Sequence, residues 1–527
     1  MTFTKGLLLA LLSASAADTG LAFARGRRDT RAGFVAPAPR NSGFAFVPPV
    51  PSSSSLQGRV STVDVFNKPP TARGAVVMVA AEVSGGAASI PAMEEPAPTT
   101  SSGVTVGRSI FNLIKNVVGA GILAIPGGVT AFSQSRGAVV PTVAMIVGLG
   151  SMSGYCFSLI GRVCASTGAS SYGDAWSKTI GEKTSWLPTS SCTAKTFFAC
   201  MAYSIIVGDV FSEVFKAFGA PAIISARTNA LCLVSSTILL PLCLLKDLSA
   251  LSYTSILGVL GTVYTAIVMG IRYFDKSYVE GGRFFSGLAE SGRPMFAGTG
   301  TLNPLALILL SMLSTAFIAH FNAPKFYAEL KDKSVKRSVA CVHDLWVFNT
   351  VVASSFAAAV SLVVIMTLFP FLTFGGASKS FILNNYATTD RLATSCRVAI
   401  ATSIVGGYPL VFMPAKTGAM SLFGYKNPTE TQRKVGTSLL LAAFTAIGVA
   451  LTDLGFVVSF GGAVLGSALV FIFPTLMWIA KCKQDAKNGN PVKGWRKAEV
   501  GANYVVAGLG VALALLGGGL SIKKSFF

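Results

Sequence analysis

Charged residues, histidines and patterned cysteines are scarce in this sequence of 527 residues. Charged residues make up 12% of the chain, whereas soluble domains carry roughly 25%, and this scarcity excludes a chain that is surrounded mainly by water. The two histidines, His320 and His343, are too few for a histidine-based metal centre. The nine cysteines form no CxxC pair, so neither a metal site nor a disulfide framework is predicted.

The sequence also lacks the motifs of nucleotide-driven machines and of hydrolytic enzymes. It contains no GxxxxGK[ST] loop, so no ATP-driven pump and no bound ATP are predicted. The glycine cluster from Gly148 to Gly154 does not match GxGxxG and lies within an apolar run. No nucleophile, base and acid form a recognisable set, which predicts that the protein is not an enzyme. The net charge of +21 is divided among short loops and the N-terminal tail, so no nucleic-acid partner is expected.

Long apolar runs dominate the chain from about residue 105 onward. Hydrophobic residues make up 52% of the sequence, and a run of about 20 such residues spans the core of a bilayer. These runs predict an all-α integral membrane protein with about eleven transmembrane helices embedded in the lipid bilayer. The predicted spans are residues 109–132, 138–161, 193–218, 229–245, 249–272, 303–324, 341–369, 395–415, 435–452, 454–480 and 501–521.

Lys and Arg are more numerous in the loops on one side of the predicted membrane than in those on the other. By the positive-inside rule, this excess predicts that the first span begins on the cytoplasm-like side and that the C-terminus lies across the membrane. The richer loops include Lys178, Lys183, Lys325, Lys331, Lys333, Arg337, Lys481, Lys483, Lys493 and Arg496.

The N-terminal tail has the composition of a targeting segment. Residues 1–22 carry one early lysine, a short apolar stretch and small residues, as a signal peptide does. Residues 23–77 are basic, rich in Ser, Pro and Ala and poor in acid, as a disordered transit peptide is. This pair resembles the bipartite plastid presequence of algae with secondary plastids and predicts a plastid envelope location. The alternatives are an ordinary disordered tail and a vacuolar or plasma-membrane location. Residues 78–104 are predicted to be a linker.

The first apolar run is interrupted in a way that predicts a functional site. The run GRSIFNLIKNVVGAGILAIP (107–126) contains Gly119, Ala120 and Gly121 and ends at Pro126. Small residues and proline allow a helix to unwind at membrane depth, where the freed backbone groups can line a cavity. Secondary transporters build substrate sites in this way. Close helix packing at the glycines is the structural alternative.

Several segments resemble, in the right order, the amino acid/auxin permease family. The first run resembles its first helix, and five further segments resemble its third, fifth, sixth, eighth and tenth helices. These are YSIIVGDVF (203–211), LKDLSALSYTSILG (245–258), STAFIAHFNAPKFYAEL (314–330), YPLVFMPAK (408–416) and DLGFVVSFGGAVLGSALVFIFP (453–474). The resemblance implies that residues 105–527 form an amino acid transporter domain of the LeuT type, with two inverted five-helix repeats and discontinuous helices 1 and 6.

The resemblance and the physics of helix ends together suggest where a zwitterionic amino acid binds. Free N–H groups suit its carboxylate, and unwound carbonyls suit its ammonium group. The backbone of Gly119, Ala120 and Gly121 is therefore predicted to bind the carboxylate. The candidates on span six are Ser314, Thr315 and Phe317, with Phe317 either beside the substrate side chain or packed in the core.

Five polar residues are candidates for ion coupling. Asn116 matches a first-helix asparagine that contributes to a sodium site in sodium-coupled members of the family, and Thr402 and Ser403 are its candidate partners on span eight. Asp209 is a candidate for gating or proton coupling, or for a structural ion pair. His320 is a candidate proton switch, or a hydrogen-bonded structural histidine.

The prediction is a secondary active transporter of amino acids that works by alternating access and is proton-coupled or uncoupled. No organic cofactor or metal is predicted, and the coupling ion is H⁺ or Na⁺. Valine and glycines at positions 405–407, where the span-eight hydroxyl is expected, favour H⁺ over Na⁺. The alternative function is a transport-incompetent amino acid sensor on the same fold.

Overall fold

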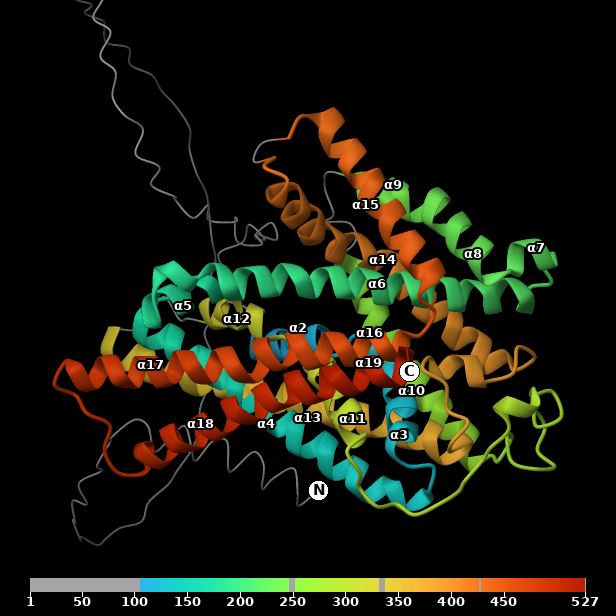
Figure 1. Cartoon of the computed structure of the whole chain (residues 1–527), viewed down its shortest axis with the longest axis horizontal. Helices are drawn as coiled ribbons and strands as arrows, with labels where there is room; N and C mark the ends of the chain where they lie inside the picture. The colour runs from blue at the N-terminus through green and yellow to red at the C-terminus, as the bar shows by residue number, and fades with distance from the viewer. Residues whose placement is uncertain (1–104, 246–251, 331–336, 426–427, 527) are drawn as a thin grey trace, which may run out of the picture. The chain divides into compact units, whose positions relative to one another are not determined.

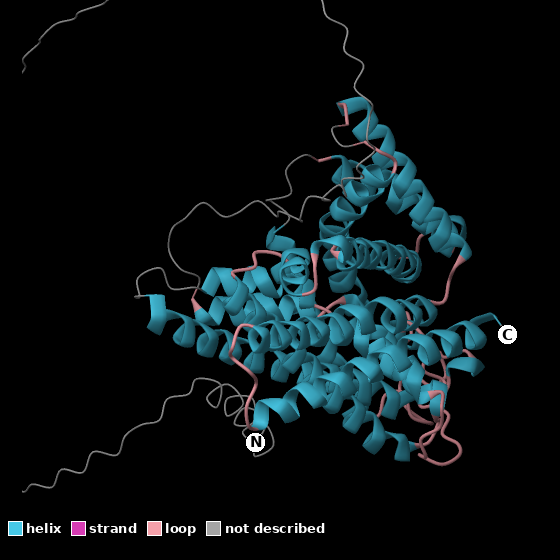
Figure 2. Ribbon diagram, turned by 60° about the vertical axis from the view of Figure 1, so that its left-hand side comes forward, coloured by secondary structure: helices cyan, strands magenta, loops and turns pink. Residues whose placement is uncertain are grey.

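A computed structural model describes residues 105–245, 252–330, 337–425 and 428–526 (Figure 1). Contacts assign all of them to one unit, whereas the second unit, Gly20–Gly86, lies outside the described residues. The predicted signal peptide (1–22), transit segment (23–77) and linker (78–104) also lie outside them. The described chain is helical apart from loops and two isolated bridges, Gln134 to Ala297 and Met295 to Gly375 (Figure 2).

Within the described residues, ten helices are long and apolar enough to cross a membrane, and one bent pair at the start brings the total to eleven. Each predicted span corresponds to one of these, so the predicted number is confirmed. The helices are α2 (Val106–Val117), α3 (Ile125–Phe132), α4 (Val139–Thr167), α5 (Tyr172–Thr179), α6 (Trp186–Ala217), α7 (Ala222–Ser225), α8 (Arg227–Val234), α9 (Leu240–Leu244), α10 (Ser252–Phe274), α11 (Ala306–Ala316), α12 (Ala323–Leu330), α13 (Arg337–Phe374), α14 (Arg391–Leu422), α15 (Glu430–Ala450), α16 (Leu454–Gly461), α17 (Phe473–Lys487), α18 (Trp495–Ala512) and α19 (Gly518–Phe526).

Two spans are interrupted, and they pack against each other. The first consists of α2, a 3₁₀ segment (Ala120–Ala124) and α3, with a bend of 43°. The sixth consists of α11, a 3₁₀ segment (His320–Asn322) and α12. Helix α11 contacts α3 and the first 3₁₀ segment, and α12 contacts α2. The predicted discontinuous helices 1 and 6 are therefore present and lie side by side.

The remaining helices surround this broken pair. Helix α6 packs on α14 and α16, α13 packs on α4 and α2, and α11 packs on α16. We call the side of the membrane on which α2 begins the entry side and the side on which α19 ends the far side. Counting the spans from Val106 places the loops 275–305 and 375–390 on the far side and the connections 168–185 and 488–494 on the entry side.

The last span is joined to the others by a buried ion pair. Arg162 of α4 donates two hydrogen bonds to Glu499 of α18, at 2.5 and 3.0 Å, and both side chains are 8% exposed. The guanidinium also stacks on Trp478 of α17, 3.8 Å from the ring centroid. Tyr155 donates to the same carboxylate at 3.1 Å and accepts from Asn503 at 2.8 Å. This network connects α4, α17 and α18 toward the entry side.

Candidate functional site

The two helix breaks are the centre of the candidate site. Helix α2 ends at Val117, and Gly119 has an extended backbone (φ −105°, ψ 171°) before the 3₁₀ segment begins. Helix α11 ends at Ala316, and the chain resumes helical structure only at His320. The small residues that are predicted to permit unwinding lie at these breaks. Their small side chains allow the unwound segments to fit between closely packed neighbours. Backbone groups at both breaks are thus released from the regular α-helical ladder.

Gly121 and Thr315, both predicted substrate-site residues, lie next to each other. A β-carbon on Gly121 would stand 3.9 Å from the Thr315 Cγ2 atom and 4.0 Å from the Val458 Cγ1 atom. Thr315 in turn donates a hydrogen bond of 2.7 Å to the carbonyl oxygen of Val458 on α16. The first break, α11 and α16 therefore meet at one point. A β-carbon on Gly119 would meet nothing within 4 Å, so open space borders this residue.

Ser314 and Phe317 point elsewhere. The buried hydroxyl of Ser314 donates to the Leu310 carbonyl oxygen at 3.0 Å, and its β-carbon lies against Gly466. The ring of Phe317 is fully buried, and its Cζ atom is 3.0 Å from the place of a β-carbon on Gly150. Ala120 starts the 3₁₀ segment of the first break. In this conformation the Phe317 side chain packs in the core, which is one of the two alternatives considered for it.

An asparagine pair connects the two breaks. Asn322 Nδ2 donates to Asn116 Oδ1 at 3.0 Å, and Asn116 is exposed. Asn116 was predicted as an ion-coupling candidate, whereas Asn322 was missed. An amide within the otherwise apolar segment HFNAP is the signal that could have identified it. Because Asn116 Oδ1 already accepts a hydrogen bond, part of its capacity to bind a cation is in use.

His320 is held in the core beside the second break. Its Nε2 atom lies 2.9 Å from the carbonyl oxygen of Ser153 on α4, and the side chain is fully buried. The rings of Phe157 and Phe356 approach it edge-on, with centroids 5.5 and 6.3 Å away. These contacts attach the 3₁₀ segment of the second break to α4.

Asp209 is part of an ion pair close to the far side. Its carboxylate accepts from Arg227 Nε at 2.6 Å and from Asn384 Nδ2 at 3.2 Å. Arg227 also donates to the Gly448 carbonyl oxygen at 2.8 Å. Asp209 thus connects α6 with α8, with the end of α15 and with the loop 375–390. The structural ion pair, which was one of the two alternatives for this residue, is present.

The two span-eight hydroxyls have their recorded contacts with their own helix and with α10. Thr402 is exposed and donates to the Val398 carbonyl oxygen of its own helix at 2.9 Å. The hydroxyl of Ser403 lies where a β-carbon of Gly258 on α10 would stand. No recorded contact among the described residues brings either hydroxyl to the first break.

The loop 375–390 covers the far side of the broken pair. A β-carbon on Gly127 of α3 would meet the Lys379 carbonyl oxygen at 2.9 Å, and one on Gly455 of α16 would meet the Ser380 hydroxyl at 3.0 Å. Only glycine allows so close an approach at Gly127, because the neighbouring atoms belong to the backbone. On the entry side, by contrast, Asn116 is exposed and Gly119 borders open space.

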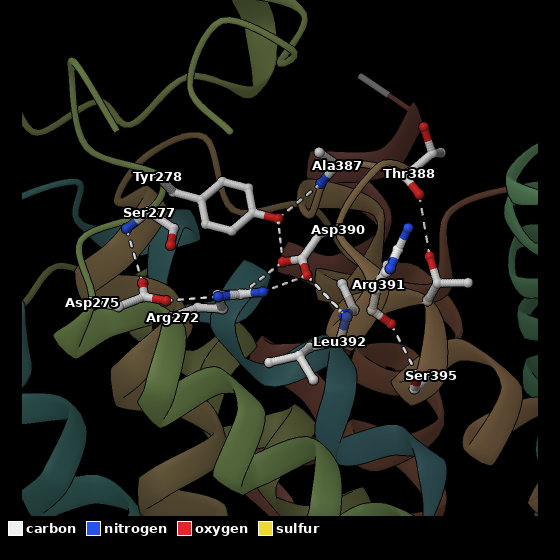
Figure 3. Close-up of polar contacts among 12 residues, drawn as sticks. Arg272, Asp275, Ser277, Tyr278, Ala387, Thr388, Asp390, Arg391, Leu392 and Ser395 are labelled. Atoms are coloured by element: carbon white, nitrogen blue, oxygen red, sulfur yellow. Dashed lines mark hydrogen bonds and ion pairs between the residues drawn. The ribbon is translucent and has the colours of Figure 1, made fainter. Parts of the chain in front are cut away.

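A buried carboxylate holds this loop in place (Figure 3). Asp390 is fully buried and accepts from Arg272 Nε and Nη2 at 2.8 and 2.7 Å and from the Tyr278 hydroxyl at 2.9 Å. It also accepts from the first backbone N–H groups of α14 as its N-cap residue. Arg272 also pairs with Asp275 at 2.6 Å, as Figure 3 shows. Burial raises the pKa of Tyr278, and the adjacent Asp390 charge raises it further.

Comparisons with known proteins agree with this architecture. The family model described as "transmembrane amino acid transporter protein" matches residues 102–520. The putative sodium-coupled neutral amino acid transporter 11 of Rattus norvegicus is 22% identical over 408 residues, covering 77% of this chain and 84% of the relative. Sodium-coupled neutral amino acid symporter 2 of Danio rerio is 24% identical over 398 residues, covering 72% and 76%.

Among solved structures, the inward facing conformation of Mhp1 is similar, with a TM-score of 0.51 and 12% identity, covering 82% of this chain and 95% of Mhp1. At this identity the similarity shows the fold alone, and it confirms the predicted LeuT-type architecture. The protein is a multi-pass integral membrane protein. Since the family model covers the whole helical domain, the chain belongs to the transmembrane amino acid transporter family.

Proposed function

We propose that this chain carries neutral amino acids across a membrane by alternating access, with the substrate bound between the breaks of the first and sixth spans. The observation that carries the proposal is the contact between Gly121, Thr315 and Val458 beside the open space at Gly119. The names of the relatives, which are neutral amino acid transporters, support the substrate class.

The proposed binding mode uses backbone groups more than side chains. The backbone N–H groups of Gly119, Ala120 and Gly121 suit the substrate carboxylate, since they lie at the positive end of the helical segment that follows. In this conformation the Gly119 N–H donates to the Val117 carbonyl oxygen at 3.1 Å, so it would have to exchange that partner for the substrate. Carbonyl groups at the end of α11, around Ser314 to Phe317, suit the ammonium group. The closed far side and the exposed entry side correspond to an inward-facing state if the entry side faces the cytoplasm, as the loop charges predict.

For the coupling ion we propose H⁺, or no coupling at all. A hard cation such as Na⁺ needs several oxygen ligands. Asn116 accepts a hydrogen bond from Asn322, Thr402 donates to a carbonyl oxygen of its own helix, and Ser403 lies against Gly258 of α10. Sodium coupling is the second candidate, because it is stated in the names of the relatives. Asp209 and His320 remain the candidates for a proton path.

Uptake into liposomes tests the proposal. Protein that begins at residue 78 would be reconstituted, and a mixture of labelled amino acids would be supplied with an imposed proton gradient, a sodium gradient or neither. Uptake of neutral amino acids that needs no sodium is the expected result. A strict sodium requirement would contradict the coupling proposal alone. Ligand-induced stabilisation without any uptake would favour the amino acid sensor instead.

We further propose that the protein resides in a plastid envelope, on the composition of residues 1–77. A fluorescent protein fused to residues 1–80 is expected to reach the plastid. A matched fusion in which Arg25, Arg27, Arg28 and Arg31 are replaced by glutamate is expected to fail, since transit peptides are poor in acid. Full-length protein at the vacuole or plasma membrane would contradict this location.

A further inference from the structure

Lys195 places a positive charge beside the second helix break. It lies on α6 nine residues after the helix begins at Trp186, which is about 14 Å along the axis from the entry-side end of that helix. Its Nζ atom is 4.8 Å from the ring centroid of Phe321, which belongs to the 3₁₀ segment of the second break. Both residues are partly exposed.

The described part of the chain provides no carboxylate for this ammonium group. The acids of α6 itself are engaged elsewhere, since Asp209 pairs with Arg227 and Glu213 pairs with Lys216. Among the described residues, the contact recorded for the Lys195 ammonium group is the one with the Phe321 ring. A cation–π contact offsets only part of the cost of placing a charge within a membrane-spanning helix. Arg162 and Arg272 each have a carboxylate. Arg397 and Lys416 of α14 have no recorded carboxylate among the described residues, but both are buried, whereas Lys195 is partly exposed.

The neighbours of Lys195 connect it with the proposed substrate site. Phe321 is followed by Asn322, whose amide donates to Asn116 on the first span. Asn116 is exposed, and the open space at Gly119 lies three residues further along the chain. The charge thus lies on the entry side of both breaks, next to the route by which a substrate would leave or enter from that side.

We propose that Lys195 is a binding residue for the substrate carboxylate on the entry-side route. This inference rests on the proposed transport function and extends it. Every amino acid carries an α-carboxylate, and that group would supply the anion that the lysine lacks. The residue would favour zwitterionic or acidic amino acids over amines of the same shape. An ammonium–carboxylate contact is charge-assisted and therefore stronger than a hydrogen bond between neutral groups.

The test compares amino acids with their decarboxylated amines. Liposomes with the protein in known orientation would be supplied with a labelled neutral amino acid from the entry side, and the apparent KM would be measured. The same preparation would be inhibited by the amino acid and by the amine without the carboxylate. In Lys195→Met the entry-side KM is expected to rise about tenfold or more, with little change at the far side and with weaker discrimination against the amine. Lys195→Arg should keep both properties.

Lys216→Met is the matched control, because Lys216 lies on the same helix, is exposed and pairs with Glu213. It should behave as the parent protein does. Equal losses for amino acid and amine, or an unchanged entry-side KM in Lys195→Met, would overturn the inference while leaving the transport proposal intact. Failure of the parent protein to transport any amino acid would instead refute the proposed function. The discrimination ratio is measured within one protein, so partial misfolding of a variant does not alter it.

Discussion

At the scale of single residues, the candidate site depends on the absence of side chains. Gly121 has room for one methyl group, since a β-carbon would make ordinary contacts of 3.9 and 4.0 Å with Thr315 and Val458. A branched side chain does not fit, because its γ-carbons would come closer to Thr315 and Val458 than van der Waals contact allows. We therefore expect position 121 to accept alanine but not valine. A comparison of these two variants is more informative than either substitution alone.

We expect Gly121→Val to abolish amino acid uptake and Gly121→Ala to retain a measurable part of it. The physical reason is that valine would fill the space between the first break, Thr315 and Val458. Overpacking of this kind costs about 1–3 kcal/mol, so the protein should still insert and be purified. The measurement is uptake into liposomes at equal protein content. Gly107→Ala, at an exposed position of α2 with nothing within 4 Å, is the control. Full uptake by Gly121→Val would rule out this site.

At the scale of helices, the last span is fixed by a buried charge pair. Glu499 receives two hydrogen bonds from Arg162 and one from Tyr155, and all three groups belong to the α4–α18 contact. Removing one partner of a buried pair leaves the other charge without compensation, which costs about 3–5 kcal/mol. The pair thus makes the packing of α18 dependent on one carboxylate.

Glu499→Gln is expected to lower the free energy of unfolding of the detergent-solubilised protein by about 3 kcal/mol, and therefore its melting temperature. The control is Glu430→Gln, because Glu430 lies at the start of α15 and forms an exposed pair with Lys434 at 3.4 Å. An exposed pair contributes about 0–1 kcal/mol, so the control should melt close to the parent protein. Similar melting curves for the two variants would show that the buried network contributes little.

At the scale of the whole molecule, the closed far side has to open if the protein alternates between two states. The closure is formed where Gly127 of α3 meets Lys379 and Ser380 of the loop 375–390. The loop is attached to α10 and α14 through Asp390 and Arg272. Movement of the broken pair relative to that loop would therefore separate Gly127 from Ser380.

We expect a disulfide between Gly127→Cys and Ser380→Cys to stop transport reversibly. A β-carbon on Gly127 would stand 3.1 Å from the Ser380 Cα atom, so the two thiols can reach each other. The same β-carbon would stand 2.9 Å from the Lys379 carbonyl oxygen, so the loop has to shift, and the Gly127→Cys single variant must first be shown to transport in its reduced form. The measurement is uptake before and after oxidation and again after reduction. Each single cysteine variant, treated in the same way, is the control for the native cysteines. Undiminished uptake with the crosslink formed would contradict movement at this contact.

The sequence predicted the spans, the two breaks and the fold, but the environment of the polar candidates could not be derived from it. Asn116 was identified, whereas its partner Asn322 was not, since a hydrogen bond between two spans depends on how both helices are rotated. The sequence does not distinguish a proton path from an ion pair at Asp209, because its partner Arg227 lies on another span. Thr402 and Ser403 were grouped with Asn116 by resemblance, and in this conformation they face outward and toward α10.

The amino-acid sequence by itself determined that this protein spans the membrane, where its helices break and which family it resembles. These properties are local, because the length of an apolar run and the presence of glycine or proline act within one helix. The tertiary structure alone decided that Asn116 meets Asn322, that Arg162 meets Glu499 and that Lys195 lies over Phe321. The physical reason is that such contacts depend on which faces of separate helices meet, and helix rotation and packing are set by the assembled bundle.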